Sequence, residues 1–164
     1  MQNLLDFLSQ KKILLLCFMA MLLIGYGFNF TEPLIGGELL DMQMNAADAQ
    51  ARLAEMSSYQ RKMHLLTTLI LDSLYPLAYG GLLAGIVGRF AHNRQRLWAA
   101  PAVFTVFIDF CENGVQSLAL MGHENLLGLK GILTPLKFGG FALAALIVIV
   151  LLLAAAYRKI TSKE

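Results

Sequence analysis

The sequence predicts an all-α polytopic membrane protein, a four-transmembrane-helix bundle with a short amphipathic helix in the first outer loop. Of the 164 residues, 57% are hydrophobic and only 15% are charged, whereas soluble domains hold about 45–50% apolar and about 25% charged residues. Four runs have the length of about 20 mostly apolar residues that a helix needs to cross a bilayer. Residues 1–164 are therefore expected to form a single membrane domain.

The expected spans cover about residues 13–30, 65–88, 98–121 and 131–157. Pro33 is expected to stop the first helix from continuing, because proline disfavours helix in the residue before it. Gly81, Gly85 and Gly88 recur on one side of the second span, a spacing that favours close helix contact. Both cysteines lie far apart inside apolar runs, so neither a disulfide framework nor a thiolate metal site is expected.

Basic residues outside the spans predict the orientation. Eight lie at the termini and after the second span, namely Lys11, Lys12, Arg89, Arg94, Arg96, Arg158, Lys159 and Lys163; four lie in the other loops, namely Arg52, Arg61, Lys62 and Lys130. The side richer in Lys and Arg usually faces the cytoplasm. Both termini are therefore expected there, and the loop of about residues 31–62 is expected outside.

The outer loop carries two helix-start signals. Asn45 followed by Asp48 is an imperfect capping signal, and Ala46, Ala49, Leu53 and Met56 recur at helical spacing. These features predict a short amphipathic helix that lies on the membrane or over the bundle mouth. Ser57 with Gln60 matches a capping box, so the second span is expected to begin as a helix outside the bilayer. In the alternative, the loop simply links two spans.

Polar residues form one stripe on each of the two middle spans. At 100° per residue, each of two sets falls within about 100° of arc: His64, Thr68, Asp72, Tyr75 and Tyr79 on the second span, and Thr105, Asp109, Glu112, Asn113 and Gln116 on the third. Counting from the outer ends places Asp72, Glu112 and Lys137 in one layer, with Asp109 level with the two tyrosines. The stripes are therefore expected to face each other.

The cost of placing charged residues in a membrane also predicts that the two stripes face each other. A central Asp or Lys costs about 2.5–3.5 kcal/mol in a spanning helix, while each Leu or Val returns only about 0.3–0.6 kcal/mol. The acids should therefore point into the bundle, paired or hydrated. Lys137 serves at most two of the three carboxylates, Asp72, Asp109 and Glu112. Full ionisation would leave a charge of −2, so a carboxyl must hold its proton or a cation must bind.

These residues make up the candidate site. Asp109 and Glu112 are the candidate acid and base, and the ligand-binding candidates are Asp72, Tyr75, Tyr79, Asn113, Gln116 and Lys137. No cofactor is expected, and no metal, because His64, His123 and Glu124 lack the spacing of convergent ligands. In the alternative, such buried polar pairs only hold helices together. A net charge of +2 is too small to indicate nucleic-acid binding.

Three segments carry a resemblance. Leu71-Asp72-x-x-Tyr75-Pro76-x-x-Tyr79, Asp109-x-x-Glu112-Asn113 and Thr134-x-x-Lys137 together resemble an uncharacterised family of small four-span bacterial inner-membrane proteins. The resemblance covers spans two to four, and the first span and the outer loop match only in kind. It implies a four-helix bundle in a bacterial inner membrane and brings no assigned activity.

The sequence is compatible with three functions. The first is binding of a lipid-like or amphiphilic small molecule at a buried acidic and tyrosine site open to the outer leaflet, with proton transfer as the reaction if the protein is an enzyme. The second is a non-catalytic accessory or assembly role, in which the outer loop docks a membrane-protein partner through Leu53 or Met56. The third is proton- or ion-coupled transport as an oligomer, which is disfavoured because the stripes stop at Tyr79 and Thr105.

Overall fold

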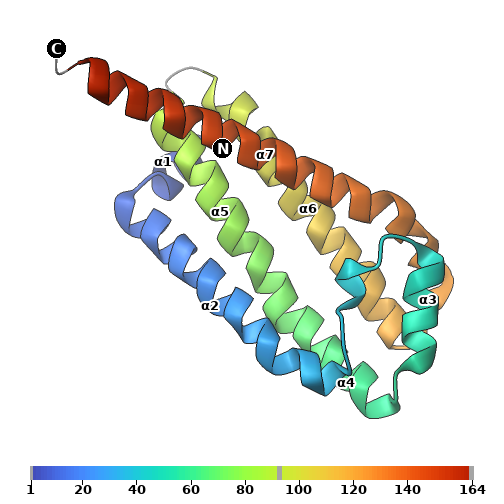
Figure 1. The fold of residues 1–164 in the computed structure, drawn as a ribbon. Helices are drawn as coiled ribbons and strands as arrows, with labels where there is room; N and C mark the ends of the chain where they lie inside the picture. Colours follow the sequence, from blue (N-terminus) through green and yellow to red (C-terminus); the bar gives the residue numbers. More distant parts are fainter. Residues whose placement is uncertain (1, 92–93, 163–164) are drawn as a thin grey trace.

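The chain folds into long helices that lie side by side, as Figure 1 shows for a computed structural model that describes residues 2–91 and 94–162. Lys163, which the orientation argument counted, lies outside the described residues. The described residues contain no strand. The α-helices are α1 (Gln2–Leu8), α2 (Lys11–Ile35), α3 (Ala46–Glu55), α4 (Ser58–Thr67), α5 (Ser73–Phe90), α6 (Gln95–Leu120) and α7 (Lys130–Thr161), joined by the 3₁₀ turns η1 (Leu40–Met42) and η3 (Glu124–Leu129) and by the π-helical turn η2 (Thr68–Asp72).

Among the described residues, three helical segments are long and apolar enough to cross a membrane. They are Lys11–Ile35, Ser58–Phe90 and Glu124–Thr161. The second runs through α4, η2 and α5 without a break, so the expected extension of this helix beyond the apolar run is confirmed. Helix α6 packs against both α5 and α7, but its acids and amides lower its apolar content, and it is not among the three. The all-α fold and the membrane character of the chain are confirmed.

Helix α2 ends later than the sequence indicated. It continues through Pro33 to Ile35, and Gly36 then takes a left-handed conformation with φ 77° and donates its N–H to the carbonyl of Glu32. The prediction that Pro33 ends the helix is wrong. A proline in the last turn removes one backbone hydrogen bond, whereas the left-handed glycine is the usual helix end.

The glycine face of α5 receives the N-terminal part of the chain. A Cβ on Gly85 would lie 2.5 Å from the carbonyl oxygen of Leu8, and one on Gly88 would lie 2.9 Å from that of Leu5. Such short distances leave no room for a side chain, so the expected close helix contact is confirmed. The contacting segment is α1, a helix that no sequence pattern predicted, and it buries Leu5 against α5.

The segment between α2 and α4 forms a packed cap on one end of the bundle, here called the bundle cap. Both start signals are confirmed: the Asn45 side chain accepts the N–H of Asp48 at 2.9 Å, and Ser57 with Gln60 forms the complete capping box. The apolar face of α3 buries Ala49 and Leu53 in one cluster with α6 residues. Of the two expected placements, α3 therefore takes the one over the bundle, and the loop is more than a link between helices.

Candidate functional site

The two polar stripes meet inside the bundle, and α7 joins them. The Tyr79 hydroxyl donates to Oδ2 of Asp109 at 2.7 Å, and Lys137 Nζ lies 2.7 Å from Oε2 of Glu112. At most 5% of each of these four residues is exposed, namely Tyr79, Asp109, Lys137 and Glu112. The expected proximity of Lys137 to Glu112 and of Asp109 to Tyr79 is therefore observed. Asp72, which was expected in the layer of Glu112 and Lys137, has a carboxylate oxygen within 4.8 Å of those of Asp41 and Asp109.

A second lysine belongs to this cluster. Lys130, which the orientation argument placed in an outer loop, is fully buried, and its Nζ donates to Oε1 of Glu112 at 2.5 Å. The Thr134 hydroxyl donates to the same oxygen. The assignment of Lys130 to a loop was wrong, because α7 begins at this residue. The helix places Lys130, Thr134 and Lys137 at helical spacing on one face. That spacing was readable in the sequence.

A fourth acid, Asp41, comes from η1 between α2 and α3, and the sequence pattern did not predict it as part of the site. It is 8% exposed, it accepts a hydrogen bond from Gln116 Nε2 at 3.1 Å, and it forms an ion pair with Lys137. Burial by itself would raise the pKa of the Asp41 carboxyl, but the charge and hydrogen bond of Lys137 outweigh it and hold this pKa below its ordinary value of 3.8. Nothing in the local sequence distinguishes Asp41 from a solvated loop acid.

His64 holds the turn that carries Asp41. The Leu40 N–H donates to Nε2 of His64 at 2.9 Å, and Nδ1 of the ring lies 3.2 Å from the Thr68 hydroxyl. Because Nε2 accepts, the proton of the neutral ring sits on Nδ1. The histidine is fully buried, so it fixes η1 against α4 and thereby positions Asp41.

The helix is locally widened at Asp72. The π-helical turn η2 ends there, and the Ser73 hydroxyl donates to the carbonyl of Thr68 at 2.9 Å. Pro76 has no N–H to give to the carbonyl four residues earlier, which is that of Asp72. The side chain of Asn113 donates to this carbonyl at 2.8 Å instead. Wide turns of this kind often occur at functional sites.

The amides of α6 thus bind the protein's own groups. Asn113 holds the main chain at Asp72, and Gln116 holds the Asp41 carboxylate. Both were expected to orient a ligand. Their carbonyl oxygens, Oδ1 of Asn113 and Oε1 of Gln116, have no hydrogen-bond partner among the described residues.

The acids outnumber their cationic partners. Four buried carboxylates, Asp41, Asp72, Asp109 and Glu112, share two buried lysines, Lys130 and Lys137. If all are ionised, the cluster carries a charge of −2. Within the part of the chain that the structure describes, Asp72 Oδ2 and Asp109 Oδ1 are buried without a hydrogen-bond partner. Uncompensated buried carboxylates are costly, so these two oxygens are the unusual feature of the cluster.

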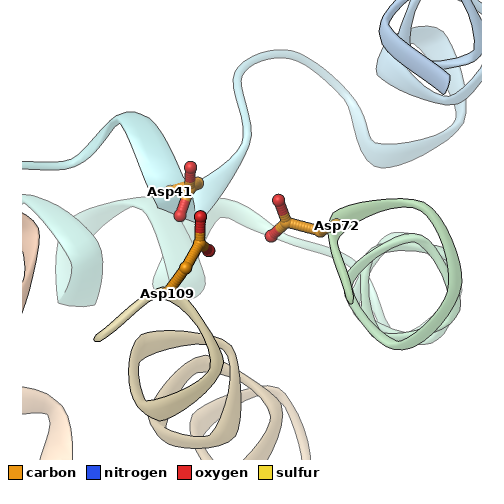
Figure 2. Close-up of side chains that lie close together, drawn as sticks. All are labelled: Asp41, Asp72 and Asp109. Atoms are coloured by element: carbon orange, nitrogen blue, oxygen red, sulfur yellow. The ribbon is translucent and has the colours of Figure 1, made fainter. Parts of the chain in front are cut away.

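Both acids face a cavity of about 260 Å³. It is lined by Asp41, Met42, Asp72, Tyr75, Tyr79, Asp109, Lys137, Phe138 and Phe141. The Tyr79 ring packs edge-to-face on Tyr75 and Phe141 at centroid distances of 5.6 and 5.2 Å. In Figure 2 the carboxylates of Asp41, Asp72 and Asp109 approach one another from three different elements. The cavity thus has an acidic end and aromatic walls.

Comparisons with protein-family models, with curated proteins and with solved structures gave no match to this chain. The functional argument therefore rests on the geometry of the cavity and its acids.

Proposed function

We propose that this chain is a four-span membrane protein whose cavity binds a lipid-like or amphiphilic small molecule. One observation carries the proposal: two nearly fully buried acids, Asp72 and Asp109, line a cavity with aromatic walls, and each has an oxygen without a hydrogen-bond partner among the described residues. The acidic end suits a head group that brings hydrogen-bond donors, a positive charge or a bound cation. The aromatic walls suit an apolar body.

Helix α6 is the fourth span in this proposal. Its 26 residues reach about 39 Å at 1.5 Å per residue, more than the hydrocarbon core of about 30 Å. Its polar residues from Thr105 to Ser117 are buried, while Val103, Phe104 and Phe107 are among its exposed apolar side chains, as lipid contact requires. We place the protein in a bacterial inner membrane with both termini cytoplasmic and the cavity toward the outer leaflet.

The geometry distributes the roles within the site. Asp72 and Asp109 contact the head group, because both residues line the cavity and each has an oxygen without a hydrogen-bond partner among the residues described. Glu112 is a poorer candidate for acid or base, since two ammonium groups and a hydroxyl already engage it. If the protein catalyses proton transfer, Asp109 with the Tyr79 hydroxyl is the group to do it.

The two alternatives gain less support. An accessory role through Leu53 or Met56 would need these side chains at the surface, but they are 1% and 6% exposed and pack in the bundle cap. A transport path would need polar groups along the whole bundle. In α6, the buried polar residues run from Thr105 to Ser117 and do not reach its beginning at Gln95.

Native mass spectrometry of gently extracted protein tests the proposal. We expect a discrete amphiphilic molecule on the wild type and its loss in two variants, Asp109→Asn at the acidic end and Phe141→Ala in the wall. The matched control is Glu55→Gln, an exposed acid on α3 whose side chain is 74% exposed.

The outcomes separate the functions. A bound molecule in the wild type and in the control, absent from both cavity variants, supports the proposal. A wild type that carries no small molecule, or one that both cavity variants retain, contradicts it. A co-purifying protein in place of a small molecule would favour the accessory role.

A further inference from the structure

We infer that Asp41, Asp72 and Asp109 form a binding site for a hard divalent cation of the class of Mg²⁺, Mn²⁺ and Ca²⁺. One carboxylate oxygen from each residue lies within 4.8 Å of the others. The three residues come from η1, from the π turn η2 and from α6, and Figure 2 shows their carboxylates converging. The inference goes beyond the proposed function, because cation binding needs no amphiphile.

The spacing suits a common central ion. Oxygen ligands lie about 2.0–2.1 Å from Mg²⁺ and about 2.3–2.6 Å from Ca²⁺. Two oxygens on opposite sides of one ion are therefore at most about 4.2 Å apart for Mg²⁺ and about 5.2 Å for Ca²⁺. The 4.8 Å limit falls within the calcium range and needs only a small side-chain adjustment for magnesium.

A second observation points to a ligand. Asp72 and Asp109 are only 4% and 5% exposed, both line the cavity, and each has a buried oxygen without a hydrogen-bond partner in the described part of the chain. A metal ion satisfies such oxygens directly. The formal charge of −2 on the four buried acids and two lysines is what one divalent cation neutralises.

The donor set selects the class of ion. Three carboxylates without histidine or cysteine favour hard, oxygen-preferring cations over zinc, which prefers nitrogen and sulfur ligands. Magnesium and calcium sites commonly add water molecules to a few carboxylates. The 260 Å³ cavity has room for them.

Lys137 is the main internal competitor, because its ammonium group pairs with Asp41. The same Nζ lies 2.7 Å from Oε2 of Glu112. Lys137 can therefore stay on Glu112 while Asp41 turns to the ion. This arrangement predicts that neutralising Lys137 strengthens cation binding, since a like charge leaves the neighbourhood of the ion.

The binding experiment uses the metal alone. Full-length protein is stripped with chelator, placed in phosphatidylcholine nanodiscs and titrated with Mn²⁺, with bound ion counted by electron paramagnetic resonance. We expect one saturable Mn²⁺ per chain, displaced by Mg²⁺ or Ca²⁺. Asp72→Asn and Asp109→Asn should each weaken binding at least about tenfold, Glu55→Gln should leave it unchanged, and Lys137→Gln should tighten it.

A second measurement locates the ion in the wild type, independently of how the carboxylate variants fold. Tb³⁺ at this site should emit on tyrosine excitation, because Tyr79 is hydrogen-bonded to Asp109. The double variant Tyr75→Phe with Tyr79→Phe should lose most of this emission.

Several results would overturn the inference. They are the absence of saturable Mn²⁺ binding to the wild type, binding that survives in both Asp72→Asn and Asp109→Asn, and Tb³⁺ emission that does not depend on the two tyrosines. Failure of the amphiphile experiment leaves the cation result standing, and the reverse also holds, because the nanodisc titration contains no ligand other than the metal.

Discussion

The buried polar cluster has two halves that differ in how completely their charges are paired. In the closed half, Glu112 contacts Lys130, Lys137 and Thr134. In the open half, Asp72 and Asp109 keep oxygens without partners beside a cavity. A network whose charges are fully paired suits helix packing, because it contributes stability without a ligand. A network with unpaired charges suits a site that a bound ligand or ion completes.

Substitutions in the two halves should change the stability of the protein in opposite directions. Removing a member of the closed half strands a buried charge and should destabilise the protein. Removing a carboxylate from the open half relieves repulsion and should stabilise the protein when no cation is present.

Glu112→Gln should cause the largest loss. The change leaves Lys130 with no ion-pair partner among the described residues while it remains fully buried. Breaking one side of a buried ion pair costs about 3–5 kcal/mol. The measurement is the free energy of unfolding in detergent, with Glu55→Gln as control, and an unchanged value would show that the closed half does not hold α6 to α7.

Leu53→Ala tests whether the bundle cap contributes as much to stability as the closed half does. Leu53 is 1% exposed in a cluster with residues of α6. Truncating a buried leucine costs about 2–5 kcal/mol. Met44→Ala on the same loop, at a side chain that is 50% exposed, should change stability little. Equal effects of the two changes would contradict the packed cap.

His64→Phe tests how Asp41 is positioned. The change leaves the buried N–H of Leu40 without its acceptor, which costs about 1–3 kcal/mol. His64→Gln keeps an acceptor and should recover part of the loss. In the cation titration the phenylalanine variant should also bind Mn²⁺ more weakly, an effect that a purely structural histidine would not produce.

Asp109→Asn should change the free energy of unfolding in the opposite direction. In chelator-treated protein it should raise the free energy of unfolding by about 1 kcal/mol, because mutual repulsion with Asp41 and Asp72 is removed. Thermal melting with chelator, and then with Mg²⁺, measures it. A clear loss of stability in chelator would place Asp109 with the structural residues.

The acid dependence of stability should show the smallest effect. The folded-state pKa of Asp41 lies below its ordinary value of 3.8, so the ion pair with Lys137 contributes stability above that pH and loses it as the pH falls through the folded value. Unfolding between pH 3 and pH 5 should therefore be less pH-dependent in Asp41→Asn. Identical profiles would show that the pair is not formed.

Much of the site was predictable because helical periodicity is local. Asp72 and Tyr79 fall on one face of their helix, and Asp109 and Glu112 fall on one face of theirs, whatever the rest of the chain does. The cost of burying such charges then requires the faces to meet. The same reasoning found the helix starts at Asn45 and Ser57, which depend on contacts three residues apart.

Other features depend on contacts between distant residues, and only the tertiary structure decided them. Asp41 meets Lys137 across 96 positions of sequence, and nothing near Asp41 indicates that its turn is held inside by His64. The role of Asn113 depends on the carbonyl that Pro76 leaves free on another helix. The sequence by itself determined which residues share a helix face; the fold decided which faces and loops meet, because those pairings come from packing between segments that local periodicity does not encode.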